Sequence, residues 1–259
     1  MNRLVVALFL FLSIMDLCYG QTNFGKPEVD PIDVQKNFTD WAAYQSDHIM
    51  LTLDFKAIDV NSNLIDKETF LKKLTLGDYF PIKLESQTDD IYYQLFKIES
   101  HSDTSIKATM VANAVEEYEH FKMEGQSFSA FHFTDLDGNV YTNESVKGKI
   151  LVIKCWYIHC APCVKEFPDL NRMVAKYKDR KDILFVSLAE DTPEQLNEFL
   201  TKKPLSYVVV PNQKKYMNET LHLNAFPTHF IITKDGVISK VLLNFESLEL
   251  ALEKESKLE

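Results

Sequence analysis

The chain has 259 residues, of which 46% are hydrophobic and 25% charged, and its net charge is -10 at pH 7. This length is enough for one large domain or two modest ones, each with its own hydrophobic core. The acidic balance argues against a nucleic-acid partner, because neutralising phosphates requires clustered Lys and Arg.

The first twenty residues have the pattern of an export signal. Arg3 supplies a positive charge, residues 4–15 form an apolar run, and the small residues Cys18 and Gly20 stand where a signal peptidase reads. The run is too short to span a bilayer comfortably, so we expect residues 1–20 to be a cleavable signal peptide that ends near Gly20. The protein is then expected to be exported, to the periplasm in a bacterium.

Residues 21–122 are expected to form a small α+β domain, whose role the sequence does not predict. Alternating apolar residues predict a strand at 51–57, and Asp66 is placed to cap a helix at 67–74. The remaining expected elements are strands at 79–84, 91–98 and 106–111 and a short helix at 115–121. No cluster of catalytic side chains stands out in this block.

Strands and helices alternate in the second block, residues 123–259. The order predicts an α/β domain with a mixed central sheet and helices on both faces. The expected strands are 131–134, 139–142, 149–155, 183–189, 207–210, 228–233 and 237–243, and the expected helices follow residue 160, Thr192 and residue 247.

The four cysteines are Cys18, Cys155, Cys160 and Cys163. Signal cleavage leaves three, with two in a Cys-x-x-Cys pair, which is typical of a redox site rather than a disulfide scaffold. The pair follows a buried strand and opens a helix, where free N–H groups and the helix dipole favour a thiolate. We therefore expect an exposed Cys160 to attack disulfides and Cys163 to resolve the mixed disulfide.

Two other interpretations of the pair fit less well. A zinc site would need a second pair of ligands, and His159 and His229 are the nearby candidates. A c-type haem would need His at position 164, which is Val164. We accordingly expect no metal and no cofactor at this site.

The segment from Lys149 to Pro168, KILVIKCWYIHCAPCVKEFP, resembles the active-site segment of the TlpA/ResA-type thioredoxins, a family of exported bacterial disulfide reductases. Trp156, Glu166 and Pro168 stand at the matching spacings from the cysteines, and Pro227 matches the family's cis-proline. The resemblance covers a little over half of the chain, from about residue 124. It implies a thioredoxin fold, a role for Glu166 beside the thiols, and substrate contacts from Trp156, Phe226, Pro227 and Thr228.

Two residues depart from the family's pattern and are candidates for tuning the thiols. Lys154 stands where related proteins hold Asp or Asn; if it is buried and charged it would favour the Cys160 thiolate, and the alternative is that it reaches the surface. His159 replaces an aromatic residue and would favour the thiolate if protonated. Cys155 and Lys154 are adjacent on a strand, so they should point to opposite faces, and Cys155 is expected to be buried and inert.

The sequence thus predicts an exported thiol–disulfide oxidoreductase that acts on disulfides of exported proteins and is re-reduced by a membrane or periplasmic thiol donor. Reduction is the expected direction, although Ala161 and Pro162 between the cysteines do not exclude oxidation. A copper-binding or redox-delivery module on the same fold is the alternative function.

Overall fold

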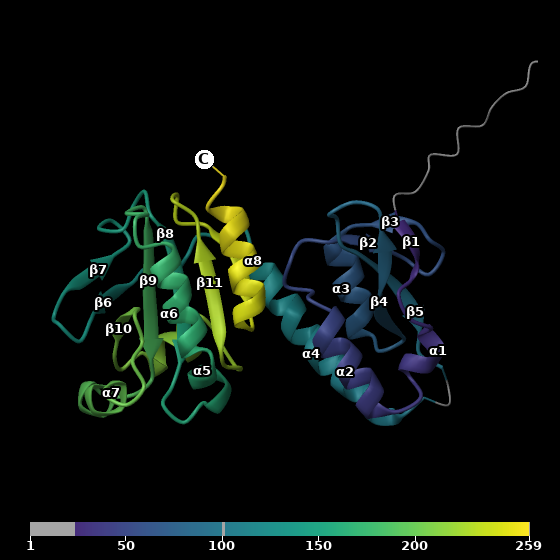
Figure 1. Ribbon diagram of the computed structural model, residues 1–259, viewed down its shortest axis with the longest axis horizontal. Coiled ribbons are helices and arrows are strands. Elements are labelled where there is room, and N and C mark those ends of the chain that lie inside the picture. Colours follow the sequence, from purple (N-terminus) through teal and green to yellow (C-terminus); the bar gives the residue numbers. More distant parts are fainter. Residues whose placement is uncertain (1–23, 100–101, 259) are drawn as a thin grey trace, which may run out of the picture.

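The computed structural model describes residues 24–99 and 102–258 (Figure 1). The predicted signal peptide, residues 1–20, lies outside the described residues. Figure 1 shows two separate sheets with the long helix α4 (Thr104–Met123) lying between them. None of the helices in the described ranges is long and apolar enough to cross a membrane.

The first sheet has five strands in the order β1-β4-β5-β2-β3. Its strands are β1 (Phe24–Pro27), β2 (Lys56–Ile58), β3 (Leu64–Ile65), β4 (Tyr79–Ser86) and β5 (Tyr92–Lys97), and the accompanying helices are α1 (Pro31–Val34), α2 (Phe38–His48), α3 (Lys67–Thr75) and α4. A core that includes Trp41, Phe70, Phe80 and Tyr93 joins this sheet to α2, α3 and α4. The Asp66 side chain accepts a hydrogen bond from the Thr69 N–H, which confirms the predicted cap of α3.

Two element predictions in this unit were wrong. Residues 51–53 form a turn, and only Lys56–Ile58 is a strand. The apolar alternation there has a different cause, because Leu51 packs in the first core while Leu53 packs in the core of the second sheet. The segment 106–111 belongs to α4, whose buried residues Ile106, Met110 and Ala114 recur every four positions, as a helix requires.

The second sheet has five strands in the order β10-β9-β8-β11-β12. β8 (Ile150–Trp156), β9 (Ile183–Ala189) and β10 (Val208–Val210) are parallel, whereas β11 (Thr228–Ile232) and β12 (Ile238–Leu242) are antiparallel to their neighbours. A core on one face joins the sheet to α5 (Ala161–Lys165), α6 (Phe167–Lys176), α7 (Pro193–Leu200) and α8 (Phe245–Glu255). The core of the opposite face includes residues of β6 (His132–Thr134) and of the π-helical turn η1 (Tyr216–Thr220).

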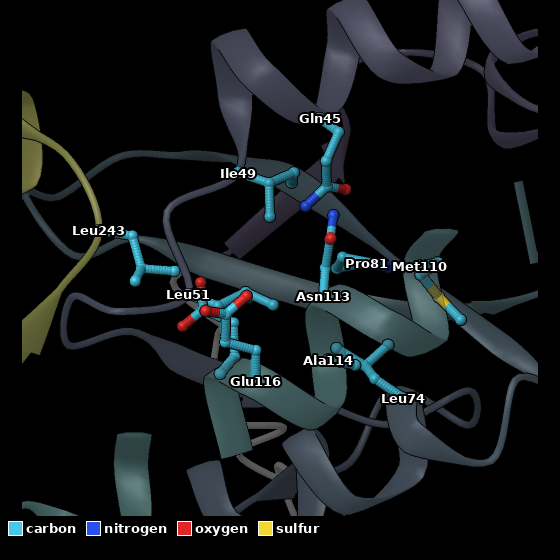
Figure 2. A pocket seen from close by; sticks show the side chains of 11 residues that line it. Gln45, Ile49, Leu51, Leu74, Pro81, Met110, Asn113, Ala114, Glu116 and Leu243 are labelled. Carbon is cyan, nitrogen blue, oxygen red and sulfur yellow. The ribbon is translucent and has the colours of Figure 1, made fainter. Parts of the chain in front are cut away.

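Ion pairs and a small cavity lie where the two units meet. Asp54, next to the turn at 51–53, accepts hydrogen bonds from Lys240 at 2.7 Å and from Lys254 at 2.6 Å. A cavity of about 220 Å³ is lined by residues of both units, among them Gln45 and Leu243 (Figure 2). The two units therefore share a contact surface rather than only the chain that links them.

Candidate active site

The cysteine pair lies at the junction of β8 and α5. Cys160 and Cys163 form a disulfide with a Cα–Cα distance of 5.3 Å. Cys160 is the residue that caps α5, and its Sγ lies 3.3 Å from the Cys163 backbone N, which donates to it. Pro162 occupies the first turn of α5, where the N–H that proline lacks is not needed. The predicted junction of strand, dithiol and helix is confirmed.

Cys160 is less exposed than its expected role as attacking thiol suggested. Its exposed fraction is 3%, and Cys163 is completely buried. Both sulfurs belong to the core between β8 and the helices, with Tyr157, Ile158 and Phe226 packed against the same core. Of the two sulfurs, that of Cys160 nevertheless belongs to the more accessible residue, which agrees with the order of attack that the sequence predicts.

The Phe226–Pro227 peptide bond is cis, as the resemblance implies, and it lies next to the dithiol segment. The Phe226 ring contacts the Tyr157 ring edge to face, with centroids 5.6 Å apart. Thr228 is the register partner of Cys155, which places the loop before β11 at the same end of the sheet as the dithiol. The loop is thus in position to contact a molecule that is bound to Cys160.

Three of the four predicted substrate-binding residues are buried, namely Trp156, Pro227 and Thr228. Trp156 is fully buried and packs edge to face on Phe167, with ring centroids 4.9 Å apart. The Thr228 hydroxyl is also buried and donates to the Ala225 carbonyl at 2.8 Å. The predicted side-chain contacts of Trp156 and Thr228 with substrate do not fit this burial, and both side chains instead support the site from within the core.

Lys154 and Glu166 form a buried ion pair behind the dithiol. Lys154 is fully buried, and its Nζ lies 2.6 Å from Oε2 of Glu166, whose side chain is 13% exposed. The prediction that Lys154 and Cys155 point to opposite faces of β8 is confirmed, because their neighbours Val152 and Ile153 belong to cores on opposite sides of the sheet. Lys154 does not reach the surface, so the alternative interpretation of this residue was wrong.

His229 completes this cluster and was missed as a site residue from the sequence. It is the register partner of Lys154 on β11, and its Nε2 lies 3.1 Å from the same oxygen of Glu166. Because a carboxylate only accepts hydrogen bonds, Nε2 carries the proton. The Nδ1 atom of His229 is buried without a partner. We call Lys154, Glu166 and His229 the buried triad.

Burial and charge shift all three pKa values of the buried triad downwards. Burial alone would raise the pKa of Glu166, but the hydrogen bond from His229 and the charge of Lys154 outweigh it and lower that pKa. Burial lowers the pKa of Lys154, and Glu166 opposes this shift. Burial together with the Lys154 charge lowers the pKa of His229. The cluster therefore favours an ionised Glu166 beside a neutral His229.

The other two residues near the pair differ in exposure. His159 is exposed on the segment that leads to Cys160. Cys155 is fully buried on the opposite face of β8 and is a free thiol, and burial raises its pKa far above the ordinary value. Within residues 24–99 and 102–258, no group of three or more His, Cys, Asp and Glu side chains is arranged to hold a metal ion.

A dithiol at a strand-to-helix junction beside a cis-proline loop, in a mixed five-stranded sheet, defines a thioredoxin-like oxidoreductase. The AhpC/TSA family model matches residues 124–241. The chain is 30% identical over 119 residues to the thiol-disulfide oxidoreductase ResA of a Bacillus cereus strain, covering 46% of this chain and 69% of that protein. ResA of Bacillus thuringiensis (strain Al Hakam) is 27% identical over 125 residues, covering 48% and 72%. The chain belongs to the ResA-type thiol-disulfide oxidoreductases.

A solved structure described as a putative thiol:disulfide interchange protein DsbE from Chlorobium tepidum is 25% identical. The match between the two structures covers 51% of this chain and 96% of that chain, with a TM-score of 0.47. The predicted thioredoxin fold and the predicted class of thiol–disulfide oxidoreductase are confirmed by the family membership.

Proposed function

We propose that this protein reduces disulfide bonds in exported polypeptides through Cys160 and Cys163. The observation that carries the proposal is the placement of Cys160 at the start of α5 with its sulfur accepting the Cys163 N–H. Free backbone N–H groups and the helix dipole at this position stabilise a thiolate. The greater burial of Cys163 suits a thiol that reacts only within the protein.

The reaction transfers two electrons from the dithiol to the substrate. The Cys160 thiolate attacks one sulfur of the substrate disulfide, forms a mixed disulfide and expels the other sulfur as a thiolate. Cys163 then loses its proton and attacks the Cys160 sulfur, which restores the Cys160–Cys163 disulfide and releases the second substrate thiolate. A membrane or periplasmic dithiol must afterwards reduce Cys160–Cys163 and is itself oxidised.

We assign supporting roles to the surrounding residues. Glu166 takes part in proton movement at Cys163, as the resemblance implies, and Lys154 and His159 tune the thiols. Pro227 and the half-buried Phe226 orient the substrate chain. A test of the tuning role is Lys154→Asn, which is expected to raise the pKa of Cys160; an unchanged pH profile of alkylation by iodoacetamide would contradict it.

The site of action that we propose is outside the cytoplasm, the periplasm in a bacterium. The sequence pattern of residues 1–20, typical of an export signal, supports this proposal. The proposed substrates carry disulfides, and disulfides persist mainly in oxidising compartments outside the cytoplasm. Secretion with cleavage near Gly20 is checked by N-terminal sequencing of the protein recovered from the exported fraction.

The redox potential of the Cys160–Cys163 couple tests the direction of the reaction. Mature protein is equilibrated in dithiothreitol or glutathione buffers and the fraction of free thiol is read by alkylation, with Cys160→Ser as the control. A potential near or below about -270 mV supports a reductase. A potential close to about -120 mV would make the protein an oxidant and overturn the proposed direction.

A further inference from the structure

A groove of about 860 Å³ lies between α4 of the first unit and the segment 220–225 of the second. This volume is within the range of roughly 300–1,000 Å³ that is typical of ligand sites. From α4 the groove is lined by Ala112, Val115 and His120, among others, and its opposite wall includes Leu221, Asn224 and Ala225. Neither unit alone supplies both walls.

The lining of the groove combines an apolar surface with hydrogen-bonding groups that lack partners. Val115 is 44% exposed and adds apolar surface to the wall of the groove that α4 supplies. His120 is 7% exposed, and its Nδ1 atom is buried without a hydrogen-bond partner. Burial lowers the pKa of His120 to about 4, so this ring is neutral at physiological pH.

The charged residues that line the groove are Glu116, Glu119 and Lys122, so acids outnumber bases among the lining residues that the structure describes. Glu119 is already paired with Lys122 at 2.7 Å. Glu116 has a buried oxygen, Oε1, without a partner. A positively charged side chain is therefore a better match for this groove than a negatively charged one.

The segment 224–227 connects the groove to the cysteine site along the chain. Asn224 and Ala225 line the groove and come directly before Phe226 and Pro227 in the chain. Phe226 contacts Tyr157, which stands three residues before Cys160. A chain that passes the cis-proline loop on its way to Cys160 can therefore continue between the two units.

We propose that this groove binds an extended polypeptide segment, neutral or basic, that flanks the cysteine of the disulfide substrate. The inference rests on the proposed reductase function and gives the first unit a role in it. α4 contributes apolar contacts through Val115, and a small disulfide that reaches only Cys160 does not use the groove.

The test compares two substrates and two matched variants of the full mature protein. The substrates are a lysine-containing peptide closed by one disulfide and the small disulfide dithiobisnitrobenzoate. Ala112→Arg places a large cation in the groove, whereas Ala108→Arg places the same side chain one turn earlier on α4, at an exposed position outside the groove. The protein is first reduced at Cys160 and Cys163 with dithiothreitol, which is then removed. Ala112→Arg is expected to lower the second-order rate constant for reduction of the peptide by about tenfold, a loss of about 1.4 kcal/mol, and to leave the rate with the small disulfide unchanged.

Val115→Arg provides a second variant with the same expected pattern, and Ala108→Arg is expected to change neither rate. The proposal is overturned if both groove variants reduce the peptide as fast as the wild type. It is also overturned if Ala112→Arg and Val115→Arg slow both substrates equally, since the effect would then not depend on polypeptide length. Failure of the wild type to reduce either substrate would instead contradict the proposed reductase function.

Discussion

Replacing Lys154 with Met tests the buried triad directly. The change removes the ammonium group but keeps an unbranched side chain of similar length, so the core around it loses little volume. The Nζ of Lys154 lies 2.6 Å from Glu166, and the Lys154 side chain has no exposed surface. In Lys154→Met, the Glu166 carboxylate therefore stays largely buried and keeps only the hydrogen bond from His229.

The expected loss of stability follows from the burial of this pair. Removing one partner of a buried ion pair costs about 3–5 kcal/mol, because the other charge is left uncompensated. In a unit of this size each kcal/mol lowers Tm by about 2–4 °C. We therefore expect the oxidised Lys154→Met protein to melt about 6–20 °C below the wild type.

Thermal unfolding of the oxidised protein, followed by circular dichroism, measures this difference. The matched control is Lys176→Met, which breaks the half-exposed pair of Lys176 with Glu253 at 3.7 Å and should cost about 0–1 kcal/mol. The double variant Lys154→Met/Glu166→Gln removes both charges and should recover most of the lost stability. The reasoning fails if Lys154→Met has the same Tm as Lys176→Met, or if the double variant is less stable than Lys154→Met.

Three further outcomes are expected. In the wild type, His229 has a lowered pKa in the native state, so below about pH 6.5 the unfolded chain binds a proton that the native protein does not. The free energy of unfolding therefore falls with falling pH, by up to about 1.4 kcal/mol per pH unit. His229→Asn should make this pH dependence weaker. Urea unfolding between pH 7 and pH 5 measures this, and a slope equal to that of the wild type would contradict it. Fully reduced native protein should alkylate at Cys160, the more accessible cysteine of the pair, but at Cys155 only after unfolding, since Cys155 is fully buried and burial raises its pKa; mass spectrometry locates the labels, and rapid native labelling of Cys155 would refute its burial. Leu53→Ala should lower the free energy of unfolding by about 2–5 kcal/mol, because Leu53 is buried in the second core although it belongs to the first block; a loss below that of an exposed Leu250→Ala control would argue against this packing.

The dithiol site could be predicted from the sequence because its parts are close together in the chain. The apolar run before Cys160 predicts a buried strand, and alternation along that strand places Lys154 and Cys155 on opposite faces. The cap that Cys160 provides for α5 follows from the same few residues. These are local rules, and the structure agrees with them.

His229 could not be found in this way, because its role depends on a register between distant strands. Its position opposite Lys154 is fixed by the pairing of β11 with β8. A signal was available: His229 is a polar residue in a short apolar strand, two residues after Pro227, and a buried polar group requires a partner. Without the register, however, no partner could be named.

The two wrong element predictions in the first block have different causes. Leu51 and Leu53 alternate as strand residues do, but they point into different units. The segment 106–111 contains the β-branched residues Ile106, Thr109 and Val111, but the stripe of Ile106, Met110 and Ala114 over a longer window indicates the helix. Contacts between units cannot be deduced from periodicity within one segment.

The geometry of the buried triad also limits what Lys154 can do to the thiols. Its charge is hydrogen-bonded to Glu166 at 2.6 Å, and Coulomb interactions weaken with distance. Seen from Cys160, the ammonium and the carboxylate largely cancel, and His229 adds no charge when it is neutral. We therefore expect the start of α5 to contribute more to the Cys160 thiolate than Lys154 does.

This balance predicts shifts of opposite sign from the acid and the base. Glu166→Gln leaves the Lys154 cation without its counter-charge, so the Cys160 pKa should fall, whereas Lys154→Asn leaves the carboxylate uncompensated and should raise it. The pH dependence of iodoacetamide alkylation measures both shifts, and Glu253→Gln, an acid on α8 that pairs with Lys257 at 2.9 Å, is the control. An unchanged Cys160 pKa in Glu166→Gln would mean that Lys154 loses its proton when Glu166 is neutralised, so that the ion pair acts as one titrating unit, and a rise would contradict the reasoning.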